Sequence, residues 1–153
     1  MNDFDFLVGE WTVANRRRQK LLQGREEWDD FPSGSTCIRL FDGAANVDWI
    51  TFPTLRSAGM TLRLFDPVRK EWSLYWASSR DGILQPPVSG SFTDGVGKFY
   101  GDDTYDAMPI RVRYVWSEIT ACSARWEQAF SVDGQQSWET NWVMTFDRLE
   151  RQR

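Results

Sequence analysis

The chain has 153 residues, which is enough for one domain of ordinary size. Its 41% hydrophobic and 26% charged residues are typical of globular proteins and exclude a disordered tail, a collagen-like repeat or a membrane bundle. The net charge of −4 argues against sequence-independent binding to nucleic acid or to an anionic membrane, and the absence of histidine excludes a Ser-His-Asp site, a His-ligated haem and an imidazole zinc site.

The first residues predict a short turn of helix over Phe4–Val8, ahead of the first strand. The segment from Met1 to Gly9 lacks a basic leader and an apolar stretch, so no secretory signal is visible. No run approaches the roughly 18 apolar residues that a membrane helix requires. We therefore expect a cytoplasmic protein that does not enter a membrane.

The remainder of the chain consists of short segments rich in aromatic and β-branched residues, separated by turn signals. The expected strands are Gly9–Arg17, Glu26–Phe31, Ser35–Phe41, Val47–Phe52, Met60–Phe65, Trp72–Ala77, Val88–Phe92, Gly97–Asp102, Ile110–Glu118, Ala124–Val132 and Trp138–Arg148. Asp-Gly pairs at 42–43, 81–82, 94–95 and 133–134 predict chain reversals, and Asp66-Pro67 predicts another. Only Arg16–Leu22 offers a further helical possibility.

About ten short antiparallel strands leave two open edges unless the sheet closes on itself or folds into two layers. The regular spacing of the hairpins favours an up-and-down barrel over a sandwich. No linker or low-complexity stretch marks a boundary. The predicted fold is therefore a single all-β barrel domain spanning residues 1–153.

The opening FDFLVGEW places Gly9-x-Trp11 at the start of the first strand, and the chain closes with Phe146-Asp147-Arg148. This pattern resembles the opening of calycin barrels such as lipocalins, in which a basic residue of a late strand covers the tryptophan. The resemblance implies that Arg148 covers Trp11. Together with LRLFDP, WSLYW and WETNWVMTFDR, the pattern is similar to an uncharacterised bacterial family of lipocalin-like proteins, which supplies no established substrate.

The sequence also departs from better-known calycins. The absence of a signal peptide and of an obvious disulfide pair separates it from secreted lipocalins. The absence of histidine separates it from nitrobindin-like haem barrels, so the resemblance does not imply an axial haem ligand. Cys37 and Cys122 have no CxxC spacing, and we expect both to be buried reduced thiols.

The aromatic content is the outlier, with nine Trp, ten Phe and four Tyr. Such an excess of rigid apolar surface fits a large core or the wall of a cavity. The candidate wall residues are Trp11, Trp49, Trp126 and Trp142. Alternation along the strands leaves open which of them face inward.

Arginines and tyrosines among the strands are candidates for ligand contacts. In Ile110–Glu118, one face carries Arg111, Arg113 and Val115, and the other carries Ile110, Val112, Tyr114 and Trp116. Pointing outward the two arginines are solvated charges; pointing inward they could bind an acidic group in bidentate fashion. Arg63 has the same ambiguity. Tyr75 lies on the face opposite Trp72 and Trp76, and its hydroxyl bonds either a ligand or a protein or water partner.

Carboxylates beside aromatic residues in the last two strands offer acid–base chemistry without histidine. A buried Glu127 or Glu139 could act as a general acid or base, and the alternative is pairing with Arg113 or Arg125. Asn141 is a further polar candidate. Asp102-Asp103 is expected to be solvated, because its spacing matches no known calcium loop. We expect no metal site and no cofactor.

The sequence favours a barrel that binds a small hydrophobic, amphipathic or aromatic ligand, with an acidic group read by Arg and Tyr. The candidate ligand-binding residues are Trp11, Trp49, Arg63, Tyr75, Arg111, Arg113, Trp126, Glu127, Asn141 and Trp142. One alternative is an enzyme using Glu127 or Glu139 as acid or base. Another is a dimerisation module whose barrel is plugged by its own tryptophans, so a homodimer stays open.

Overall fold

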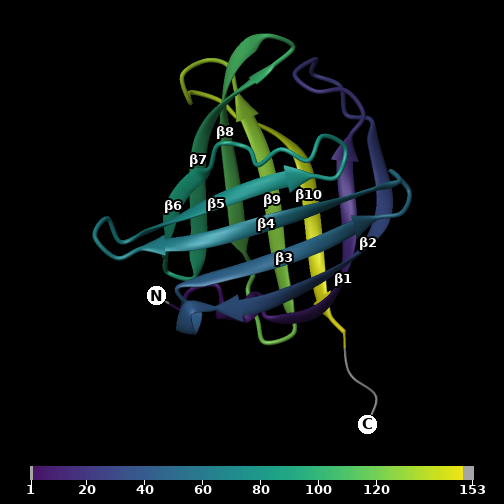
Figure 1. The fold of residues 1–153 in the computed structure, drawn as a ribbon. Helices are drawn as coiled ribbons and strands as arrows, with labels where there is room; N and C mark the ends of the chain where they lie inside the picture. The colour runs from purple at the N-terminus through teal and green to yellow at the C-terminus, as the bar shows by residue number, and fades with distance from the viewer. Residues whose placement is uncertain (1, 150–153) are drawn as a thin grey trace.

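The structure is a computed structural model that describes residues 2–149. Over these residues ten antiparallel strands close into one barrel, in which each strand pairs with its sequence neighbours and β1 pairs with β10 (Figure 1). The strands are β1 (Gly9–Arg18), β2 (Trp28–Leu40), β3 (Ala45–Phe52), β4 (Ser57–Asp66), β5 (Glu71–Ser78), β6 (Val88–Thr93), β7 (Val96–Tyr105), β8 (Met108–Ser117), β9 (Ser123–Ser131) and β10 (Glu139–Arg148). Two 3-10 helices, η1 (Asp5–Leu7) and η2 (Phe41–Gly43), precede β1 and β3. The predicted all-β up-and-down barrel is confirmed.

The prediction of two strands at Glu26–Phe31 and Ser35–Phe41 is wrong, because one continuous strand, β2, runs from Trp28 to Leu40 through the expected break. Pro32 between them does not interrupt the strand. It pairs with Ala14 of β1, whereas pairing with β3 begins only at Gly34. At Pro32, the edge of β2 that faces β3 is therefore unpaired, so the N–H group that proline lacks costs no hydrogen bond with β3.

The predicted turns lie between strands. The four Asp-Gly pairs occupy the β2–β3, β5–β6, β6–β7 and β9–β10 connections. Asp66 accepts hydrogen bonds from the backbone N–H groups of Val68 and Arg69, at 2.9 and 3.2 Å, in the β4–β5 turn. Arg16–Leu22 is not helical, because β1 continues through Arg18.

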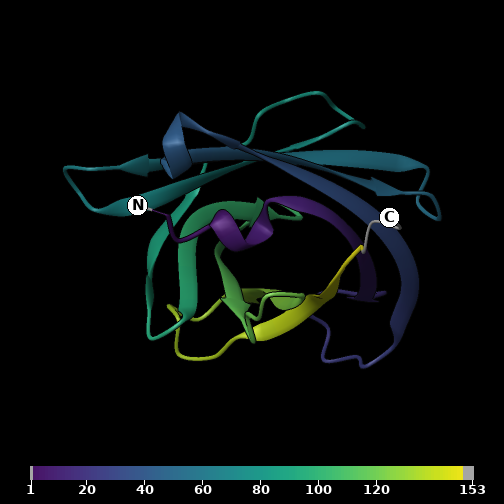
Figure 2. The ribbon, with the colours of Figure 1, turned by 90° about the horizontal axis from the view of Figure 1, so that it is seen from below.

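The N-terminal segment fills one end of the barrel. Seen from below, η1 lies inside the ring of strands (Figure 2). Phe4 is only 1% exposed, and its ring centroid lies 5.0 Å from Trp72 and 4.9 Å from Phe92. The predicted helical turn therefore acts as a plug of aromatic side chains.

Arg148 closes the same end from outside. Its guanidinium carbon lies 4.2 Å from the ring centroid of Trp11, and it donates hydrogen bonds to the carbonyls of Phe6 and Val8 at 2.7 and 2.6 Å. Gly9 has a φ of +122°, and a Cβ atom there would come within 2.6 Å of Arg148 Nη1. A glycine is required here both by the backbone and by the guanidinium. The expected contact between Arg148 and Trp11 is confirmed.

No helix of the described residues is long and apolar enough to cross a membrane. Among residues 2–149, no cluster of three or more Cys, Asp or Glu side chains could hold a metal ion.

Candidate functional site

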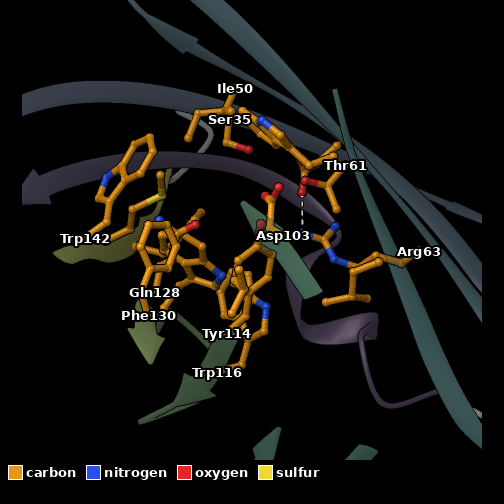
Figure 3. Close-up of a pocket in the computed structure, with 17 residues that line it drawn as sticks. Ser35, Ile50, Thr61, Arg63, Asp103, Tyr114, Trp116, Gln128, Phe130 and Trp142 are labelled. Atoms are coloured by element: carbon orange, nitrogen blue, oxygen red, sulfur yellow. Dashed lines mark ion pairs between the residues drawn. The ribbon is translucent and has the colours of Figure 1, made fainter. Parts of the chain in front are cut away.

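The half of the barrel away from η1 encloses a cavity of about 250 Å³ (Figure 3). Apolar cavities of ~150 Å³ can hold one benzene ring, so this space accommodates a ligand with one or two rings. Its walls are mostly aromatic and aliphatic, formed by Ile50, Leu74, Trp76, Val112, Tyr114, Trp116, Trp126, Phe130, Trp142, Met144 and Phe146. Polar groups come from Ser35, Asp48, Thr61, Arg63, Asp103 and Gln128. The mixture of rigid rings and a few polar groups is typical of a small-molecule site.

Arg63 forms part of the cavity wall, opposite Trp142 in Figure 3. Arg63 is 3% exposed, and its Nη2 lies 2.6 Å from Oδ2 of Asp48. The guanidinium also donates a hydrogen bond to Oδ1 of Asn46 at 3.1 Å and lies 5.2 Å from the ring centroid of Phe4. Asn46 in turn donates to the Phe4 carbonyl at 3.4 Å. The ion pair therefore separates the aromatic plug from the hollow half of the barrel.

This pairing limits what Arg63 can do. Its positive charge is already compensated by Asp48, and a ligand carboxylate would compete with that contact. Its Nε has no hydrogen-bond partner in the described part of the chain. Arg63 thus lines the cavity, but its charge is neutralised by the ion pair with Asp48.

Tyr114 supplies an unpaired hydroxyl. The side chain lines the cavity, and its hydroxyl makes no hydrogen bond with any residue between 2 and 149. Burial, and next to it the negative charge of Asp103, raises the pKa of Tyr114 to about 12, while Arg63 lowers it. The phenol is therefore neutral at physiological pH and can donate a hydrogen bond to a ligand.

A chain of side-chain amides holds the opposite wall. Trp142 donates through Nε1 to Oδ1 of Asn15 at 3.0 Å, and Asn15 donates to Ser33 at 2.8 Å. Gln128 donates to Oδ1 of Asn141 at 2.8 Å, where a register shift interrupts the pairing of β10 with β9. These contacts fix the Trp142 ring and the Gln128 amide beside the cavity.

Three of the predicted ligand-binding residues line the cavity, namely Arg63, Trp126 and Trp142. Trp11 instead lies in the closed end, where its Nε1 donates to the Leu7 carbonyl at 2.8 Å. Asn141 is 1% exposed and lies behind Gln128. Trp11 and Asn141 therefore support the barrel and the cavity wall rather than border the space.

The expectation that Trp49 and Tyr75 line the cavity is wrong. Trp49 is 46% exposed and alternates with the buried Asp48 and Ile50. Tyr75 alternates with the buried Leu74, and the neighbouring Trp76 lines the cavity. Both point away from the barrel interior because successive strand residues face opposite sides.

The same alternation shows that the inward orientation considered for Arg111 and Arg113 is wrong. Their neighbours Val112 and Tyr114 line the cavity, so both arginines lie on the outer face. Arg111 pairs with Asp102 at 3.1 Å, and the Arg113 guanidinium lies 4.5 Å from the ring centroid of Trp138. The alternation of arginines and apolar residues predicted from the sequence is present, and closure of the barrel decides which of the two faces points inward.

The carboxylates predicted for acid–base chemistry do not border the cavity. Glu127 lies on the outer face, 3.3 Å from Arg125. Glu139 lies at the start of β10 and accepts a hydrogen bond from the Leu22 amide at 2.6 Å. Asp102 and Asp103 are both exposed, as expected, and Asp103 also borders the cavity.

Tyr114 and Trp116 are wall residues that were not among the candidates from the sequence. The signal was present, because both lie on the apolar face of Ile110–Glu118. The expectation of two buried thiols holds for Cys37 and is wrong for Cys122, which is exposed; both cysteines are free.

No family model matches the sequence, and no curated protein matches it. Among solved structures, the chain is similar to the S-type phycobiliprotein lyase CPES from Guillardia theta, with a TM-score of 0.62 and 10% sequence identity. The match covers 97% of this chain and 92% of that one. At this identity the likeness shows the fold alone, a lipocalin-like barrel.

Proposed function

We propose that this protein binds a small aromatic or amphipathic molecule inside the barrel. One observation carries the proposal: a cavity of about 250 Å³, walled by tryptophans, adjoins a tyrosine hydroxyl without a hydrogen-bond partner in the described residues. The rings of Trp76, Trp126 and Trp142 would contact the flat body of the ligand, and Tyr114 would donate a hydrogen bond to an acceptor on it.

The same cavity and further observations support this proposal over the alternatives. A barrel filled entirely by its own side chains would leave no space of about 250 Å³. Glu127 and Glu139 lie away from the cavity, so acid–base catalysis by either has no geometric support. The shared fold of a phycobiliprotein lyase is consistent with a ligand-handling barrel, and the Gly9-x-Trp11 opening supports membership of the lipocalin-like family.

The experiment is a fluorescence titration with N-phenyl-1-naphthylamine, a neutral two-ring probe, followed by energy transfer from tryptophan. We expect saturable binding to the wild-type chain. Val112→Phe, which fills the cavity, should raise the Kd about tenfold or more, equivalent to about 1.4 kcal/mol. Val115→Phe on the outer face of the same strand is the matched control and should leave the Kd unchanged.

Circular dichroism and unfolding transitions establish that both variants are folded. Equal affinity of the Val112→Phe and Val115→Phe variants would place the probe outside the barrel. A wild-type chain that binds neither this probe nor a panel of aromatic acids and fatty acids would refute the proposed function.

A further inference from the structure

Arg17 lies where the inward face of β1 reaches the end of the barrel opposite η1. It pairs in register with Trp142, whose side chain lines the cavity, and paired residues of neighbouring strands share a face. The Arg17 guanidinium carbon lies 4.6 Å from the centroid of the Trp142 ring. Because Trp142 is itself held by Asn15, the guanidinium has a fixed platform at the edge of the cavity.

The charge of Arg17 is not compensated by a direct partner. Within residues 2–149 it forms no ion pair and donates no hydrogen bond, in contrast to Arg63. Burial and the like charge of Arg80 lower the pKa of Arg17, and Tyr105 and Asp29 offset this only in part. The Asp29 carboxylate accepts a hydrogen bond from Gln19 at 2.9 Å. A half-buried guanidinium repelled by a second arginine and stacked on an indole is a favourable site for an anion.

We propose that Arg17 binds the anionic group of the cavity ligand. This inference rests on the proposed function and adds the ligand class and orientation. The ligand is an aromatic or amphipathic carboxylate, sulfonate or similar anion, with its apolar body between the tryptophans and its charged end at the mouth. The stacked guanidinium keeps its N–H edges available for such a group.

The test compares two probes of similar ring structure, 8-anilinonaphthalene-1-sulfonate and the neutral N-phenyl-1-naphthylamine. Arg17→Gln should raise the Kd of the sulfonate about tenfold, the usual cost of losing one charge-assisted hydrogen bond. It should change the Kd of the neutral probe less than about twofold. Arg16→Gln is the matched control, because Arg16 lies on the outer face near Trp28 and should affect neither probe.

Arg17→Lys is the second variant, because it retains the charge and should recover part of the sulfonate affinity if Arg17→Gln disturbs the fold. If the wild type binds neither probe and no member of the panel of aromatic acids and fatty acids, the proposed function fails and the inference fails with it. If the wild type binds both but Arg17→Gln weakens both equally, or neither, the cavity stands and the role of Arg17 is refuted.

Discussion

The indole of Trp76 lies so close to Gly59 that a Cβ atom on Gly59 would come within 1.9 Å of the ring. Gly59 is buried on β4, and Trp76 on the neighbouring β5 forms part of the cavity wall. The absence of a side chain at Gly59 therefore leaves the space that the Trp76 ring occupies in one wall of the proposed binding site.

Gly59→Ala should displace the Trp76 ring, because the ring is too rigid to accommodate a contact of this length. We expect a loss of about 1–3 kcal/mol in the free energy of unfolding, which is typical of overpacking, and a changed Kd for N-phenyl-1-naphthylamine. Gly34→Ala is the control, since its Cβ would have no neighbour closer than 3.8 Å. Equal stability and affinity of both variants would show that Trp76 moves freely.

Arg148→Ala should open the closed end of the barrel. It removes the guanidinium over Trp11 and the hydrogen bonds to the carbonyls of Phe6, Val8 and Ala121. We expect a loss of about 2–4 kcal/mol by urea unfolding. Arg148→Lys should recover little of it, because an ammonium cannot reach several carbonyls at once. Full recovery by lysine would mean that charge alone is sufficient.

Asp48→Asn should leave the buried Arg63 charge without its partner and reduce the free energy of unfolding by about 3–5 kcal/mol. The double variant Asp48→Asn with Arg63→Met should regain part of this loss, because the unpaired charge is then absent. Asp102→Asn is the comparison, since its ion pair with Arg111 is largely exposed and contributes less than about 1 kcal/mol. Similar losses for both single Asp variants would contradict the role of burial.

Tyr114 should make the protein less stable at alkaline pH. Its pKa is raised from 10 to about 12 in the folded state, so the folded state holds the proton more tightly than the unfolded state. The contribution is present in full below pH 10 and decreases as the pH rises towards 12, by on the order of 2 kcal/mol. Tyr114→Phe should remove this component, measured as the difference in unfolding free energy between pH 9 and 11.5. An unchanged slope in the variant would refute the buried, neutral phenol.

The two thiols should differ in reactivity. Burial raises the pKa of Cys37 to about 12, whereas Cys122 is exposed. An aromatic disulfide reagent at pH 8 should therefore modify one thiol of the native protein rapidly and the second only after denaturation. Cys122→Ser should abolish the rapid phase, and a rapid phase that persists would place Cys37 within reach of solvent.

Much of the architecture was predictable because it depends on local patterns. The Asp-Gly pairs located the hairpins, and the alternation in Ile110–Glu118 separated the arginines from the wall residues Tyr114 and Trp116. The contact of Arg148 with Trp11 was expected from the resemblance to calycin openings. Pro32 misled the prediction, because its effect depends on whether a neighbouring strand pairs at that position.

The sequence by itself determined that the chain alternates apolar and polar side chains along short strands that reverse at Asp-Gly turns. Only the tertiary structure decided which face points inward, that Arg63 is neutralised by Asp48, and that Arg17 meets Trp142 from the other end of the chain. The physical reason is that these contacts depend on strand register and on the closure of β1 against β10, which no short stretch of sequence encodes.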